Sequence, residues 1–223
     1  MRRAITRGML RATIALCVIA GCAIAWQVFS RRSVVIDLKP NEYVLSYTMA
    51  WGLGMDQRLT LERKGWPWAV GSSDWIEIWK KPYNSGAAVY VSETDDTYYI
   101  GTGYKLIFVT PLQDTVLASC DERLTPKLTP FAERLSHRGF EPIDDKIDPG
   151  AARTQSYISA DEVGEATSVS PPPSRYYAGL RYLGRFGIIH PGHTRAPNRG
   201  SEVGFAPAGS APEPRLALQS SCG

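Results

Sequence analysis

An uncharged run of eighteen residues, from Ala12 to Phe29, constrains this chain more than any other feature. Four arginines precede the run within residues 1–11, and Arg31 and Arg32 follow it. An α-helix rises about 1.5 Å per residue, and about 20 such residues are needed to cross about 30 Å of hydrocarbon. The run therefore predicts a single transmembrane or signal-anchor helix at residues 12–29, behind a basic cytoplasmic tail at residues 1–11.

The arginines also predict the orientation of this segment. Four lie before the run and two after it, so the positive-inside rule places the N-terminus in the cytoplasm and the rest of the chain in the periplasm. Two cleavage interpretations remain open. Ala23-Ile24-Ala25 is an A-x-A site with cleavage before Trp26, and Ile19-Ala20-Gly21-Cys22 resembles a bacterial lipobox in which Cys22 is lipidated. An uncleaved anchor, a cleaved signal and a lipidated Cys22 all place the following domain outside the cytoplasm. The uncleaved anchor makes the chain a single-pass protein of the inner membrane.

The net charge of +3 belongs to this N-terminal segment. Six of the 25 basic residues lie in residues 1–32, which contain no acid, so residues 33–223 carry 19 basic against 22 acidic groups. A domain with a net charge of −3 gives no electrostatic reason to expect a nucleic-acid partner.

Short strands dominate the exported part. Strand patterns occur at 34–38, 42–47, 58–62, 75–79, 104–109 and 115–119, and apolar and polar residues alternate at 58–62 and 75–79. Residues 88–93 and 97–100 predict a hairpin around a polar turn at 94–96, and one short helix is expected from Thr129 to before Gly139. The expected fold is mainly β, an antiparallel sandwich or partly open barrel with one short helix.

Composition divides the exported part into three regions. Residues 33–140 form the β-rich domain. Residues 141–174 contain seven acidic residues and then three successive prolines, which is typical of a loop or linker. In residues 175–223, strand patterns return at 176–182, 186–189, 203–205 and 215–219, and we expect these strands to complete the same domain.

Four cysteines divide into two pairs. Cys17 and Cys22 lie in the apolar run, whereas Cys120 and Cys222 belong to the exported part. An oxidising compartment favours a disulfide between Cys120 and Cys222, which would fix the C-terminus to the domain. Two free thiols are the alternative.

Tryptophan has the most uneven distribution. Five of the six lie within 29 residues: Trp51, Trp66, Trp68, Trp75 and Trp79. Such a cluster suits an aromatic platform for a glycan, a peptide or a lipid headgroup, and the alternative is packing in the core.

Motifs that carry chemistry are sparse. His190-Pro-Gly-His193 could offer two imidazoles to a metal, with Glu202 as the nearest third ligand by sequence, although a solvated turn explains the same residues. The chain has no P-loop, G-x-S-x-G, H-E-x-x-H or EF-hand pattern. No cofactor is expected, and a non-enzymatic interaction or structural role with an envelope protein or glycan is favoured. The alternatives are a glycan- or peptide-binding module using the tryptophans and a metal-assisted hydrolase at His190 and His193.

Overall fold

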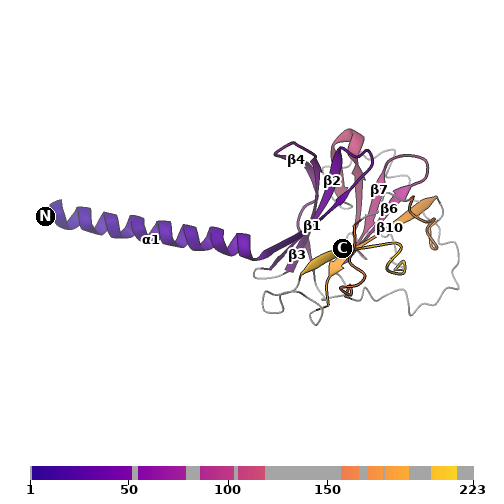
Figure 1. The fold of residues 1–223 in the computed structure, drawn as a ribbon. Helices are drawn as coiled ribbons and strands as arrows, with labels where there is room; N and C mark the ends of the chain where they lie inside the picture. Colours follow the sequence, from indigo (N-terminus) through magenta and orange to yellow (C-terminus); the bar gives the residue numbers. More distant parts are fainter. Residues whose placement is uncertain are drawn as a thin grey trace.

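A long helix followed by a β domain makes up the chain in this computed structural model (Figure 1). The structure describes residues 2–51, 55–78, 86–102, 105–118, 157–165, 170–177, 179–190 and 202–214. Side chains are described for these residues except 2–11, 27–29, 51 and 55.

The helix α1 (Arg2–Phe29) projects away from the domain (Figure 1). Ser30 follows it and donates its N–H to the Trp26 carbonyl at 2.9 Å, and the first strand begins at the next residue. Every described side chain of α1, from Ala12 to Trp26, is exposed. Among the described residues, no helix has the length and apolar character required to cross a membrane, so the predicted transmembrane span is not supported.

Five antiparallel strands form one sheet, here sheet A. It orders β1 (Arg31–Asp37), β2 (Tyr43–Trp51), β3 (Met55–Arg63) and β4 (Ala69–Ser72), and β5 (Ile76–Glu77) also pairs with β3. Alternation explains why this sheet forms, because one face is buried and the other is solvated. Tyr43, Leu45, Tyr47 and Met49 of β2 point into the core, whereas Thr48 between them is only half-buried.

Six antiparallel strands form sheet B in the order β11-β10-β6-β7-β8-β9. These strands are β6 (Ala87–Ser92), β7 (Tyr98–Gly101), β8 (Leu106–Thr110), β9 (Thr115–Ala118), β10 (Leu180–Ile188) and β11 (Val203–Pro207). A short 3-10 helix, η1 (Pro111–Gln113), connects β8 to β9. Because β10 lies between β6 and β11, C-terminal strands and earlier strands share one sheet.

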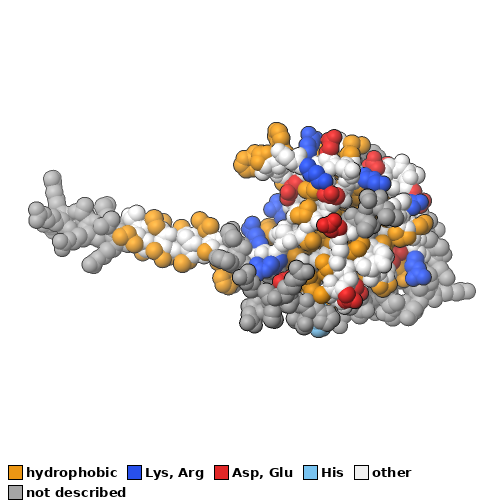
Figure 2. Space-filling model, viewed as in Figure 1, with side chains coloured by type: hydrophobic (Ala, Val, Ile, Leu, Met, Phe, Trp, Pro, Cys, Tyr) orange, Lys and Arg blue, Asp and Glu red, His pale blue; other side chains and the backbone are white. Residues whose placement is uncertain are grey.

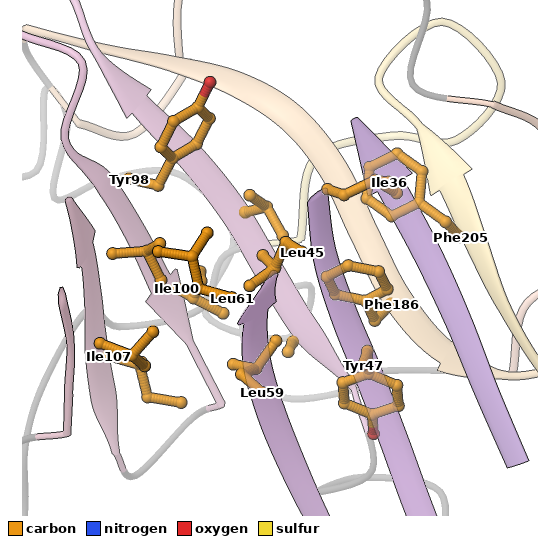
Figure 3. Close-up of a cluster of buried hydrophobic side chains, with 14 of the residues drawn as sticks. Ile36, Leu45, Tyr47, Leu59, Leu61, Tyr98, Ile100, Ile107, Phe186 and Phe205 are labelled. Carbon is orange, nitrogen blue, oxygen red and sulfur yellow. The ribbon is translucent and has the colours of Figure 1, made fainter. Parts of the chain in front are cut away.

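The main core lies between the two sheets (Figure 3). Leu45, Tyr47, Leu59 and Leu61 of sheet A meet Ile100, Ile107, Phe186 and Phe205 of sheet B, and all are at most 2% exposed. The sheets also approach at both edges, where β1 contacts β11 and β4 contacts β9. The predicted mainly β fold with antiparallel sheets is therefore confirmed.

A second apolar cluster covers the outer face of sheet B. It contains Ala88, Tyr90, Tyr99, Leu106, Phe108, Tyr177, Leu180 and Tyr182. Both faces of sheet B are therefore buried, which explains why β6 is apolar over five consecutive residues instead of alternating.

The predicted elements agree with the structure to different degrees. The β6–β7 hairpin is confirmed, whereas the strand expected at 75–79 is reduced to β5 among the described residues. Within the predicted linker, Ile158 is fully buried and pairs with Ile189, and Pro173 pairs with Arg181. The expected helix at 129–139, the strand at 215–219 and both partners of the expected disulfide, Cys120 and Cys222, lie outside the described residues.

Candidate binding surface

The tryptophans predicted as a platform occupy separate places on sheet A. Trp66 and Trp68 lie in the connection between β3 and β4, and Trp75 directly precedes β5. Because β4 pairs with residues 60–62 of β3 and β5 with residues 56–57, the two locations are at opposite ends of β3. At about 3.3 Å per residue, these ends are separated by roughly 15 Å or more. Trp79 and the side chain of Trp51 lie outside the described residues.

Trp66 and Trp68 form the tip of the β3–β4 hairpin. Their side chains are 60% and 72% exposed. The turn that presents them is well defined, because the Trp66 N–H donates to the Arg63 carbonyl at 2.9 Å and Gly65 adopts a φ of 77°. Glycine takes this left-handed conformation without the steric cost that a side chain imposes. Pro67 further restricts the backbone between the two indoles.

Two ion pairs hold the base of this hairpin. Arg63 Nη2 lies 3.2 Å from Asp114 Oδ2 and donates to the Tyr43 hydroxyl at 2.8 Å. The pKa of Arg63 is raised, first by the hydrogen bond to Tyr43 and then by the charge of Asp114. Lys64 Nζ lies 2.9 Å from Asp37 Oδ2. The two cations next to the exposed indoles therefore already have anionic partners within the domain.

Two guanidinium groups lie close to the Trp75 ring. Its ring centroid is 5.6 Å from Cζ of Arg31 and 5.7 Å from Cζ of Arg58, distances at which a cation is attracted to an aromatic face. Arg58 is fixed by a hydrogen bond from Nη2 to Ser72 Oγ at 2.7 Å and from Nε to the Ser73 carbonyl at 3.1 Å. Trp75 remains 37% exposed, so one part of its ring is accessible.

The two arginines at Trp75 were not recognised as site residues in the sequence. In the sequence, Arg31 is a charge that flanks the apolar run, and Arg58 is the first residue of a predicted strand. No local spacing connects them to Trp75, because they come from β1 and β3 and meet it through sheet pairing. The sequence therefore carries no local signal that Arg31 and Arg58 lie beside Trp75.

A buried polar network lies on the outer side of sheet B. Ser174 Oγ donates to Glu213 Oε1 at 2.5 Å, and the Arg175 N–H donates to Glu213 Oε2 at 2.7 Å. Burial raises the pKa of Glu213, whereas the hydrogen bonds from Ser174, Arg175 and Tyr90 oppose this rise. Burial also raises the pKa of Tyr90 well above its usual value.

A serine that donates to a carboxylate can be a nucleophile with its general base, but the surroundings of Ser174 argue for a structural role. Its Oγ also accepts the N–H groups of Tyr176 and Tyr177 at 3.2 and 3.0 Å, which occupy the lone pairs that an attack would use. Ser174 is 6% exposed. The network therefore fixes residues 174–177 to the segment that contains Glu213.

Comparison of the chain with protein-family models, curated proteins and solved structures found no match.

The histidine pair is only half described. His190 is exposed, its N–H donates to the Ile158 carbonyl at 2.8 Å, and its ring packs edge-on against Tyr157 with centroids 5.4 Å apart. His193 lies outside the described residues. Within the described part of the chain, no group of three or more His, Cys, Asp or Glu side chains is arranged to hold a metal ion. The predicted metal site at His190 and His193 therefore has no described ligand set.

The cysteines of α1 carry free, exposed thiols. Cys22, the lipidation candidate, is thus sterically accessible, and so is Cys17.

Proposed function

We propose that this chain is a non-enzymatic interaction module of the bacterial envelope, held at the membrane by residues 12–29 with its β domain outside the cytoplasm. The observation that carries the proposal is the exposure of apolar side chains on all sides of the part of α1 whose side chains are described, residues 12–26. The six large ones are Ile14, Leu16, Val18, Ile19, Ile24 and Trp26, each at least 55% exposed.

These side chains do not form one stripe. With 3.6 residues per turn, positions 14, 16, 19 and 24 point to different sides of the helix axis. Figure 2 shows hydrophobic side chains along the described length of α1. A helix that packed on a globular partner would be apolar on one side only, whereas a helix that is apolar all round is typical of a lipid environment. Transfer of six such side chains from water is favourable by about 10 kcal/mol.

The direction of insertion follows from the charges that flank the run. Arg2, Arg3, Arg7 and Arg11 precede it, and Arg31 and Arg32 follow it, so the rule that basic loops stay inside supports an external β domain.

The polar groups of the domain support binding over catalysis. Among the described residues, Ser174 and Glu213 are the pair that most resembles a nucleophile with its base. Both side chains are buried and accept hydrogen bonds from backbone N–H groups. The accessible features are instead aromatic, at Trp66, Trp68 and Trp75. Exposed aromatic groups on a rigid scaffold are suited to recognition of another surface.

Charge substitutions in α1 test whether residues 12–29 hold the chain at the membrane, the role called the tether below. The variant Ile19→Lys/Ile24→Lys places two cations in the apolar run and should move the chain from the carbonate-resistant membrane fraction to the soluble or aggregated fraction. Val35→Lys makes the same chemical change at an exposed apolar position of β1 and should leave the chain in the membrane. In spheroplasts, added protease should digest the β domain of the wild-type chain. Retention of the double variant in the membrane, or protection of the domain until the membrane is opened, would contradict the proposal.

A further inference from the structure

We propose that the tip of the β3–β4 hairpin is a second membrane contact, with Trp66 and Trp68 placed in the headgroup layer of the membrane that α1 enters. This inference rests on the proposed tether and adds the surface by which the domain lies against the bilayer. It concerns the tip alone, because Trp75 is less exposed and already contacts Arg31 and Arg58.

The two indoles at the tip of the hairpin expose a large apolar area to solvent. Outside α1, three tryptophans are among the exposed hydrophobic residues that the structure describes, and Trp66 and Trp68 are much more exposed than Trp75. A single residue, Pro67, separates them, and its ring restricts the backbone of the turn. A restricted turn loses little conformational entropy when its side chains insert into another phase.

The shape of the tip favours a flat partner. Small ligands bind in concave pockets that surround most of their surface, whereas a hairpin tip is convex. Indole combines a large apolar ring with one N–H donor, and for this reason tryptophan accumulates where hydrocarbon meets the polar headgroups.

The tip of the hairpin lies on the same side of the domain as α1 (Figure 1). Sheet A lies on the side of the domain from which α1 departs, and the connection at β4 projects on that same side (Figure 1). The space-filling view shows hydrophobic side chains on this projection (Figure 2). Trp26, 65% exposed in the last turns of α1, lies where the helix approaches the domain. A bilayer around α1 would therefore have its headgroup layer on the side to which the tip extends.

The charges at the base of the hairpin define the kind of contact. Arg63 and Lys64 are paired with Asp114 and Asp37, so the base carries little net charge. The contact would depend on the indole rings and not on attraction to anionic lipid. Its strength should accordingly change little with salt concentration.

The full chain reconstituted in phosphatidylcholine vesicles tests the inference. The vesicles contain lipid brominated either near the headgroup end or near the methyl end of the acyl chain, because bromine quenches tryptophan only at short range. The tryptophan emission of the tip is obtained by subtracting the emission of the Trp66→Tyr/Trp68→Tyr variant from that of the wild type. We expect this emission to be quenched by headgroup-proximal bromine and protected from acrylamide, equally at low and high salt. The matched control, Trp75→Tyr, should lower total emission without changing the quenched emission of the tip.

Separate results distinguish failure of this inference from failure of the tether. A chain that floats with the vesicles while its tip emission stays unquenched by lipid and open to acrylamide would overturn the inference and leave the tether intact. Saturable quenching of the tip by envelope glycan fragments, without quenching by lipid, would also overturn it and assign the tip to a glycan. A chain that does not float would overturn the tether itself. Circular dichroism of the tyrosine variant, unchanged from the wild type, shows that the comparison is made between folded proteins.

Discussion

Tyr47 of β2 stacks on Phe186 of β10, with ring centroids 5.0 Å apart and ring planes only 6° from parallel. The contact joins sheet A to sheet B at the centre of the core, and Phe186 continues it to Phe205 of β11 at 5.0 Å. The hydroxyl of Tyr47 is satisfied by donation to Gln57 Oε1 at 2.9 Å, so this buried tyrosine incurs no penalty for an unpaired polar group.

Removal of the Phe186 ring should therefore weaken the contact between the two sheets. We expect Phe186→Ala to lower the free energy of unfolding by about 3–5 kcal/mol, because the ring is fully buried and its neighbours come from both sheets. Leu112→Ala, at a position that is 68% exposed, should change it by at most about 0.5 kcal/mol. Denaturant unfolding of the full chain in detergent, followed by near-UV circular dichroism, measures both. Equal effects of the two substitutions would mean that the sheets do not pack as described.

Gly184 occupies the irregular position where β10 pairs with β6. Its φ is 147°, and a Cβ at this position would collide with the Ala206 carbonyl oxygen and lie 2.5 Å from Phe205 Cζ. Gly184→Ala should thus destabilise the fold by about 3 kcal/mol or more, from steric overlap and backbone strain together.

The control for this substitution is Gly209→Ala, because a Cβ at residue 209 meets nothing within 4 Å. Thermal unfolding in detergent compares the two variants. Unfolding of Gly184→Ala at the wild-type temperature would show that β10 and β11 do not have the described register.

Glu213 predicts a defined pH dependence of stability. Burial raises its pKa in the folded state above the usual value of 4.5, so the folded chain binds this proton more tightly than the unfolded chain. The contribution of Glu213 to stability is then fully present below pH 4.5 and is lost as the pH rises through the raised pKa. Glu213→Gln cannot titrate, and its unfolding temperature relative to wild type should increase as the pH rises through this window.

The measurement is a series of thermal unfolding curves in detergent from below pH 4.5 to neutral pH. Glu165→Gln serves as the control, since residue 165 is exposed. If the wild type and Glu213→Gln give parallel pH profiles, the burial of this carboxylate is not what shifts its pKa.

The expected disulfide between Cys120 and Cys222 can be tested on the exported protein. Intact mass should increase by two hydrogens on reduction, because one bridge takes up two hydrogen atoms. A bridge that closes a loop of 101 residues would stabilise the fold by at most about 4.7 kcal/mol on the chain-entropy model. No gain in mass on reduction would establish two free thiols and leave the C-terminus without this connection.

Local patterns predicted the strands whose one face is solvated. Leu59 and Leu61 alternate with polar residues at 58–62, and this period of two predicts the strand that is β3 in the structure. The β6–β7 hairpin was equally accessible, because its turn is short and its two strands are consecutive.

Patterns within one segment do not predict which distant strands pair with each other. β10 lies beside β6 although almost ninety residues separate them, and no local signal specifies that neighbour. For the same reason, the sequence does not predict the cluster of tyrosines on the outer face of sheet B or the contacts of Trp75 with Arg31 and Arg58. Trp66 and Trp68 are a different case, because Gly65 and Pro67 beside them are residues typical of a turn.

The most direct test of the account is the intact mass of the protein recovered from washed membranes of an expressing Gram-negative host. We expect the mass of the whole chain in the membrane fraction if residues 12–29 hold it there as proposed. A chain that begins at Trp26 and occurs only in the soluble fraction would contradict it. A chain that begins at an acylated Cys22 would contradict the helical tether as well, and would assign membrane attachment to the lipid instead.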